Sequence, residues 1–312
     1  MRWSIFFVVL CTLATGVGGQ SRSTRGWTDF GSSHVNKWMQ IAPAKMGPNA
    51  LPVPSMDYGR IGKSSGIELG AHAHVMEGDT AVNSYLSLSW VVVPEKVEVR
   101  AWGNPSETFR MNNDVRDERQ VYYDDTGWIT HPGDIWLSTR IQLLKDHRRL
   151  PDFILQYSLK TTSGSMKHGR YSDAGVHHFY FAMGKSFSPE ASFPDEIRVA
   201  GLGGFYVWQT NKVEMAQDEG PLLEVGIELR QKNISFFGEA GGYFGADAYE
   251  YIGITGDNDP LVYRLRVLRS GSLFDWKAEY MAGIQDYHYH TFKFGMVWRF
   301  SFVSSGGLKQ EQ

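Results

Sequence analysis

The pattern of hydrophobic and polar positions is most regular near the end of the chain, over residues 290–302. Lys293 and Arg299 occupy odd positions there, whereas the even positions carry large apolar side chains. This strict period of two predicts a β-strand with two unlike faces. A transmembrane barrel strand accommodates both, since its apolar side chains contact lipid and its polar ones face a wet lumen. The residues predicted to face lipid are Phe292, Phe294, Met296, Trp298, Phe300 and Phe302.

Similar alternation recurs along most of the chain. We therefore predict an all-β protein, a transmembrane antiparallel up-and-down β-barrel of about 12 strands that spans residues 66–302. The even number of strands predicts that both termini lie in the periplasm. The expected strands cover residues 66–76, 82–93, 97–101, 133–144, 152–161, 175–187, 196–209, 221–230, 234–244, 261–269, 274–282 and 290–302.

The connections between these stretches alternate in length. Those after every second strand are short, whereas most of the others are longer and polar, above all residues 103–132. Short periplasmic turns and long outer loops are typical of outer-membrane barrels. In that orientation, Trp90, Trp276, Trp298 and Phe300 fall near the periplasmic strand ends, where an aromatic girdle is expected.

The beginning of the chain predicts export. Arg2 precedes a short apolar run and the small residues that end at Gly19, so residues 1–19 read as a cleavable signal peptide. The only cysteine, Cys11, lies inside it, which leaves the mature protein without disulfides, thiolate metal sites or cysteine nucleophiles. A long exported chain without disulfides favours a bacterial protein. Its net charge of -3 provides no basic field for nucleic acid.

Two tracts flank the predicted barrel. Residues 303–312 form a C-terminal tail, and residues 20–65 form a segment rich in Pro, Gly and Ser. Pro48, Pro52 and Pro54 exclude a helix or a central strand in its second half. The segment is either a periplasmic leader or a plug that packs inside the barrel, and its apolar side chains fit the second alternative.

Charged residues share the inward parity across most strands. They form either a structural ion-pair network that stiffens the barrel or a charged constriction that selects small polar or anionic solutes. Glu98 belongs to the same face. The candidate lumen and constriction residues are Glu68, His72, Arg100, Arg140, Lys160, Arg198, Glu224, Glu228, Arg230, Glu239, Arg264, Arg266, Lys277, Glu279, Lys293 and Arg299.

Other constellations offer little chemistry. The chain lacks the His-x-Ser pair of outer-membrane phospholipases. Asp257, Asp259 and the Asp286–His288 stretch resemble the carboxylate and histidine pairs of omptin-type proteases only weakly, because Asp-x-Asp is common in turns. His72 and His74, like His288 and His290, form pairs that lack a third metal ligand. We expect no enzymatic activity, no metal and no cofactor.

Three stretches resemble known families. The strand that ends at Phe302 is similar to the closing strand of outer-membrane porin-type proteins, which implies contact with the barrel-assembly machinery, although Val303 to Gln312 follow it. The hairpin from Gly133 to Pro151, with residues 158–164, looks like that of the MetA-pathway phenol-degradation outer-membrane family. Residues 47–54 look like uncharacterised exported proteins of Bacteroidetes.

Together these features predict a protein of the Gram-negative outer membrane whose partner is the lipid bilayer. The expected function is a channel or transporter that passes small hydrophilic solutes through a charged lumen. One alternative is a closed structural or surface-interaction barrel without transport. Another is an exported soluble barrel or sandwich that binds a ligand, which would be extracted without detergent.

Overall fold

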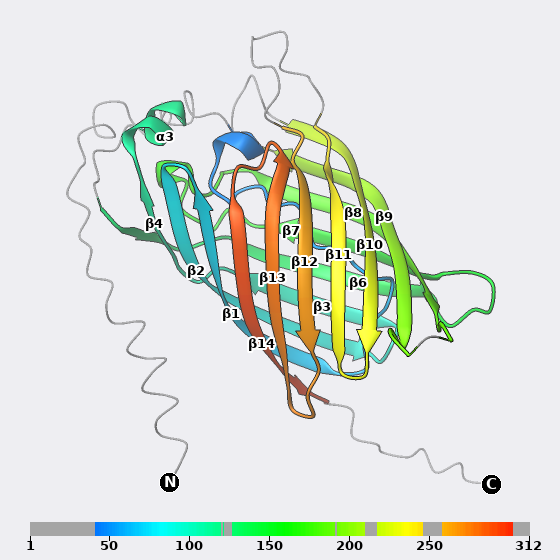
Figure 1. The fold of residues 1–312 in the computed structure, drawn as a ribbon. Helices are drawn as coiled ribbons and strands as arrows, with labels where there is room; N and C mark the ends of the chain where they lie inside the picture. The colour runs from blue at the N-terminus through cyan, green and yellow to red at the C-terminus, as the bar shows by residue number, and fades with distance from the viewer. Residues whose placement is uncertain are drawn as a thin grey trace, which may run out of the picture.

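Twelve antiparallel strands form a closed barrel in the computed structural model of the chain (Figure 1). The structure describes residues 41–119, 121, 127–190, 192–209, 217–245 and 258–301. Each barrel strand pairs with its neighbours along the chain, and β1 pairs with both β2 and β14, which closes the barrel. The predicted fold is confirmed. The barrel strands are β1 (Ser65–Met76), β2 (Asp79–Val93), β3 (Val97–Gly103), β6 (Ile135–Leu144), β7 (Asp152–Lys160), β8 (Gly175–Phe187), β9 (Glu196–Gln209), β10 (Gln217–Gln231), β11 (Ile234–Tyr243), β12 (Leu261–Arg269), β13 (Phe274–Gln285) and β14 (His290–Phe300).

The barrel has two unlike rims. The turns between β2 and β3, β6 and β7, β8 and β9, β10 and β11, and β12 and β13 lie at one end, which we call the turn rim. The connections 104–134, 161–174 and 286–289 lie at the other, the loop rim. The end of β14 belongs to the turn rim, because Phe300 pairs with Ser65 at the start of β1.

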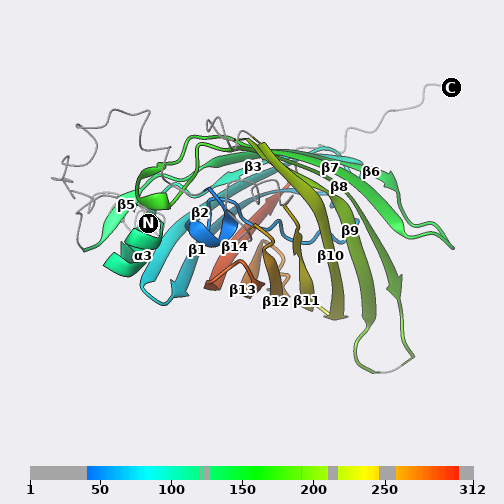
Figure 2. The same cartoon turned by 90° about the horizontal axis from the view of Figure 1, so that it is seen from above.

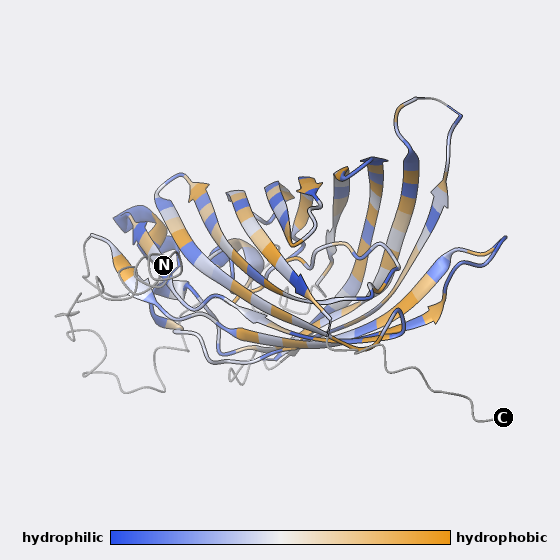
Figure 3. Cartoon of the chain, turned by 90° about the horizontal axis from the view of Figure 1, so that it is seen from below, coloured by the Kyte–Doolittle hydropathy of each residue, from blue (hydrophilic) through white to orange (hydrophobic). Residues whose placement is uncertain are grey.

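The outer wall is apolar over most of its height. Figure 3 shows hydrophobic and hydrophilic bands alternating along the strands. In β14, Phe292, Phe294 and Trp298 are 53%, 55% and 44% exposed, whereas Thr291 is fully buried. Met296 and Phe300 are half-buried, and Phe302 lies outside the described residues. Large apolar side chains that face outward in this number are costly in water and favourable in lipid.

Substitution of Phe294 by arginine tests the outward face. Phe294 lies near the middle of β14, so Phe294→Arg should lower the free energy of unfolding in lipid vesicles by about 2–4 kcal/mol. Phe274→Arg is the matched control, because Phe274 faces outward at the turn rim, where the cost should be about 0–1 kcal/mol. Equal losses of unfolding free energy at both positions would contradict a lipid belt centred at the height of Phe294.

The long connection between β3 and β6 contains elements that the sequence pattern did not predict. These are β4 (Glu107–Met111), the short helix α3 (Asn113–Glu118) and β5 (Ile129–His131). They form because β3 ends opposite Leu86, which leaves the loop-rim half of β2 without a partner on that side. The strand β4 pairs with that half, from Asp79 to Asn83, and β5 pairs with β4.

Helical structure is sparse and local. The side chain of Asn112 caps α3 by accepting a hydrogen bond from Val115 N. A second short element is the 3-10 helix η2 (Lys167–Gly169) in the connection between β7 and β8. Among the described residues, no helix has the length and hydrophobicity of a membrane-spanning helix.

Residues 41–64 run inside the barrel from the loop rim to the turn rim. They begin with the 3-10 helix η1 (Pro43–Lys45), where Lys45 Nζ lies 2.7 Å from a Glu118 carboxylate oxygen in α3. They end where Glu95 N, in the turn between β2 and β3, donates to Gly62 O over 3.1 Å. Seen from above, this blue segment lies on the inner side of the curved wall (Figure 2).

This path bears on the expected position of the two termini. Both ends of the barrel wall do lie at the turn rim, as an even number of strands requires. However, Ile41, the first described residue, lies at the opposite rim, because residues 41–64 cross the lumen before β1 begins. Strand counting alone cannot detect a segment that crosses without pairing. The predicted signal peptide, the rest of residues 20–65 and residues 303–312 lie outside the described residues.

Candidate functional site: the barrel lumen

The candidate lumen residues form several groups of ion pairs on the inner wall. All of them except His72 have an oppositely charged partner within 4 Å, and most are buried. The pairs, with their partners, are Glu68 with Arg100 and Lys277, Glu98 with Arg140, Lys160 with Asp134, Arg198 with Asp152, Arg230 with Glu228 and Glu196, Arg264 with Glu224 and Glu239, Arg266 with Glu239 and Glu279, Lys293 with Glu279, and Arg299 with Asp275.

The density of pairs is highest on β11 to β14. Glu279 lies between two cations, 2.8 Å from Lys293 Nζ and 3.7 Å from Arg266 Nη1. Arg266 also donates to Glu239 over 2.6 Å. These residues come together because antiparallel pairing places positions of like parity side by side on neighbouring strands. Arg299 differs from the rest, since it is half exposed at the turn rim.

The histidine pairs are split between the lumen and the rim. His74 is buried and contacts Thr291 Oγ1 and Asn83 Oδ1 at 2.9 and 2.7 Å. His72 stacks on Tyr85 with ring centroids 4.8 Å apart. His288 and His290 are exposed at the loop rim. Among the described residues, no group of three His, Cys, Asp or Glu side chains has the arrangement of a metal site.

A second charged network, which the sequence pattern missed, lies at the loop rim. Asp79 accepts hydrogen bonds from Arg119 Nη1 at 2.8 Å, from Tyr289 OH at 2.5 Å and from Arg170. Arg170 also pairs with Glu107 at 2.5 Å, and all of these side chains are nearly or fully buried. They come from β2, β4, the 104–134 connection, the connection between β7 and β8 and the connection between β13 and β14, so no single stretch of sequence contains them.

The electrostatics of this rim network are those of a tightly paired set. Burial by itself would raise the pKa of Glu107, but the Arg170 charge and hydrogen bonds from Tyr171 and Asn49 hold it below its usual value. Burial would likewise lower the pKa of the Arg170 guanidinium, and the neighbouring Glu107 and Asp79 charges raise it instead. Both groups are therefore ionised at neutral pH.

Residues 41–64 are held to the inner wall by hydrogen bonds to their backbone. Tyr243 OH donates to Leu51 O over 2.8 Å, and Arg264 Nη2 donates to Val53 O over 2.7 Å. Further down, Arg198 Nε donates to Tyr58 O over 2.8 Å. These bonds satisfy carbonyl groups of a segment that has no sheet partner of its own.

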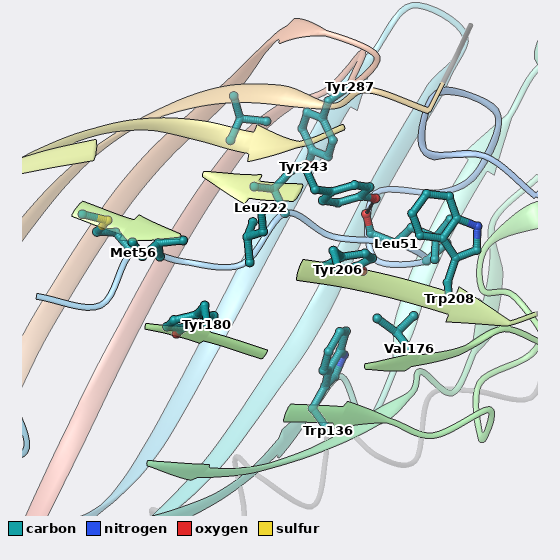
Figure 4. Packing of buried hydrophobic residues seen from close by; sticks show 14 of the residues in the cluster. Leu51, Met56, Trp136, Val176, Tyr180, Tyr206, Trp208, Leu222, Tyr243 and Tyr287 are labelled. Carbon is teal, nitrogen blue, oxygen red and sulfur yellow. Dashed lines mark hydrogen bonds between the residues drawn. The ribbon is translucent and has the colours of Figure 1, made fainter. Parts of the chain in front are cut away.

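Apolar packing holds the same segment. Leu51 and Met56 are 4% and 5% exposed, and Figure 4 shows them on the inner segment among the aromatic side chains of the wall. Tyr206 and Tyr243 stack there with ring centroids 3.9 Å apart. Sequence parity assigned the lumen a polar character, but this part of it is an apolar core shared between segment and wall.

Glycines allow the segment to approach the wall closely. A side chain at Gly184 of β8 would overlap Tyr58 O and the Arg198 guanidinium. A side chain at Gly226 of β10 would lie 2.9 Å from the Tyr58 hydroxyl. Both glycines occupy inward positions, and glycine inside a strand is a known sign of close backbone approach.

The segment fills only part of the lumen. A cavity of about 390 Å³ remains between residues 49–60 and the wall formed by β1 to β3, β6 to β8 and β12 to β14. Its lining carries more cations than acids, because three carboxylates that pair with these cations, Glu68, Glu98 and Glu239, are not among the lining residues. The charged lining residues are Arg60, Arg100, Arg140, Arg266, Lys277, Lys293, Asp57 and Glu279.

Comparison with solved structures places the fold. An outer-membrane channel from Pseudomonas putida F1 is similar over 80% of this chain and 100% of that chain, with a TM-score of 0.53 and 10% identity. The chain has the fold of a bacterial outer-membrane β-barrel. The KdgM porin in complex with disordered oligogalacturonate is also similar, at 11% identity and a TM-score of 0.45, over 75% of this chain and 99% of that one. No family model matches the sequence, and no curated protein matches it.

Proposed function

We propose that the protein is an outer-membrane channel that passes small hydrophilic solutes between residues 41–64 and the charged wall. The cavity of about 390 Å³ carries this proposal, because it runs beside the segment and is lined by charged and polar side chains. Its size is within the range of small-molecule sites. The similarity to an outer-membrane channel supports the fold on which the proposal depends.

In this proposal, residues 41–64 act as an internal constriction. They cross the lumen from rim to rim and are fixed by backbone hydrogen bonds from Arg198, Arg264 and Tyr243. A segment bonded in this way narrows the path through the lumen. Because residues 41–64 also fill much of the lumen, they are the feature that favours the alternative, a closed barrel with a structural or surface role.

The orientation and export of the protein follow as further proposals. The loop rim faces the cell exterior and the turn rim faces the periplasm, as the lengths of the connections indicate. Residues 1–19 direct export and are removed, and the C-terminal strand engages the barrel-assembly machinery. The likeness to the MetA-pathway family and to exported proteins of Bacteroidetes remains a prediction.

Single-channel recording tests the function. We expect the mature protein in planar bilayers to show a small, steady conductance, and a variant without residues 20–62 to show a several-fold larger one, because the lumen is then cleared from rim to rim. Heat-modifiability on gels shows that each form is a folded barrel.

Two outcomes would contradict the proposal. Conductance that appears only after the deletion would show that no open path exists between residues 41–64 and the wall, and that the segment closes the barrel as a gate. The absence of conductance from both folded forms would overturn the channel itself and favour the closed structural barrel.

A further inference from the structure

One region of the described inner wall carries polar atoms that take no part in its ion pairs or hydrogen bonds. It lies on β3, β6 and β8 and is continuous, since Arg100 is paired in register with Ser138, Ser138 with Ser158, and Ser158 with His178. Arg100, Ser138 and His178 all line the cavity beside residues 49–60. We call Arg100, Ser138, Arg140 and His178 the polar patch.

Three atoms of the polar patch have no hydrogen-bond partner among the described residues. They are Ser138 Oγ, Arg140 Nε and His178 Nδ1. Ser138 and His178 are only 4% and 3% exposed, so their polar atoms are removed from bulk water. A buried donor without an acceptor destabilises a fold, which makes such a group in a cavity wall a sign of a ligand.

In Arg140, only one of the three guanidinium nitrogens is without a hydrogen-bond acceptor in the part of the chain that the structure describes. Its two terminal nitrogens are occupied, since Nη1 donates to Glu98 over 3.0 Å and Nη2 donates to Arg60 O over 3.1 Å and contacts Asp57. Only Nε remains, and Arg140 lies on the same inward face of β6 as Ser138, two residues away. The Cα atoms of two such residues are about 6.6 Å apart along a strand, so both side chains can donate to the two oxygens of one carboxylate.

Flat aromatic surfaces lie beside these donors. Trp102 and Trp136 stack in parallel, with ring centroids 5.6 Å apart and planes within 10°, and both line the cavity. The Arg100 guanidinium lies 5.1 Å from the centroid of the Trp102 ring. Trp136 in turn contacts His178, with centroids 5.5 Å apart. A ring-shaped ligand body would therefore find apolar surface directly next to the donors.

The cavity charge favours an anion. Across from the polar patch, Lys277 and Lys293 line the same cavity, and the lining as a whole has six cationic and two acidic side chains. Glu68, the carboxylate partner of Lys277, does not line the cavity, whereas Glu279, the partner of Lys293, does. This field attracts anions and repels cations of similar size.

We propose that the polar patch and the Trp102–Trp136 pair form a binding site for a small organic anion with one carboxylate and a flat ring. The carboxylate accepts hydrogen bonds from Ser138 Oγ and Arg140 Nε, and the ring lies along the tryptophan pair. The proposal rests on the channel function and names the class of solute that this path selects.

Titration calorimetry of the mature, full-length protein in detergent tests the site directly. The probes at neutral pH are benzoate, acetate, which has the charge without the ring, and benzyl alcohol, which has the ring without the charge. We expect benzoate to bind at least about tenfold more tightly than either. Ser138→Ala should weaken benzoate binding about five- to tenfold, because it removes one hydrogen bond to a charged group.

Matched variants separate the site from general effects. Ser235→Ala removes another buried inward serine, which bonds to Glu228 on β10 and does not line the cavity. Trp136→Leu should reduce benzoate binding at least as strongly as Ser138→Ala, whereas Trp298→Leu changes a tryptophan of the outer wall and should leave it unchanged. Gel mobility before and after heating confirms that each variant is folded.

Calorimetry tests the binding site and conductance tests the channel, so either proposal can be overturned without the other. Equal affinities for benzoate and acetate, or a Ser138→Ala variant that binds benzoate like the unmodified protein, would overturn the site while a measured conductance leaves the channel in place. Benzoate binding that depends on Ser138 in a barrel without conductance would overturn the channel and support the site as a binding site alone.

Discussion

Replacement of Arg170 by methionine should lower the free energy of unfolding by about 3–5 kcal/mol, because it leaves two buried carboxylates without their shared cation. Arg170 contacts both Asp79 and Glu107, and all three side chains are fully buried at the loop rim. The same guanidinium lies 4.5 Å from the centroid of the Phe109 ring, a contact that methionine retains only in part. Urea-induced unfolding of the protein in lipid vesicles measures the change.

The matched control is Arg149→Met. Arg149 is exposed in the turn between β6 and β7, so the same chemical change there should cost less than about 0.5 kcal/mol. An Arg170→Met variant as stable as this control would show that the ion pairs of Arg170 contribute nothing to the stability of the barrel.

The dependence of stability on pH distinguishes this mechanism from simple loss of packing. In the unmodified protein the pKa of Glu107 is lowered in the folded state, so its stabilisation is present above the unfolded pKa of about 4.3 and is lost as the pH falls through the folded pKa. Without Arg170, burial dominates and raises the folded pKa. The variant should therefore regain stability as the pH falls from 7 toward 4, whereas the unmodified protein should not.

Replacement of Gly184 by leucine should displace residues 41–64 from the wall near Tyr58. Any side chain at this position overlaps Tyr58 O and the Arg198 guanidinium that donates to it. Overpacking of this kind costs about 1–3 kcal/mol. Cleavage by trypsin after Arg60 should therefore accelerate about tenfold or more, because the protease cuts the locally released state. Cleavage after Lys63 does not report this release, because Lys63 is already exposed.

Gly203→Leu on β9 provides the comparison. A Cβ at Gly203 lies 3.6 Å from the Leu223 side chain, which is exposed on the outer wall, so leucine there contacts apolar surroundings rather than the segment. Its rate of cleavage should equal that of the unmodified protein. Equal rates in the two variants would indicate that contact at Tyr58 does not hold residues 41–64 in the lumen.

The wall of the barrel could be predicted because each strand carries its own evidence. In β14 the alternation of Phe292 and Phe294 with Lys293 indicates both the strand and its two faces, with no information from elsewhere in the chain. The inward parity of charges such as Glu279 and Lys293 follows from the same pattern. Their pairing at 2.8 Å could not be read from it, because that distance depends on the register between β13 and β14.

The elements at the loop rim could not be predicted, since they depend on partners far away in sequence. The strand β4 forms because β3 ends early and leaves half of β2 unpaired. Arg170 and Glu107 are 63 residues apart and belong to stretches without alternation. Only closure of the barrel brings them together around Asp79.

The sequence by itself determined that this chain forms a twelve-stranded barrel with an apolar exterior and a charged interior, because a period of two is a local property of each strand. Only the tertiary structure decided how the interior is occupied. Residues 41–64 have no periodicity, and their path is set by wall groups such as Arg198, Arg264 and Gly184 that contact them across the lumen. The cavity and its polar patch are what remains between that path and the wall.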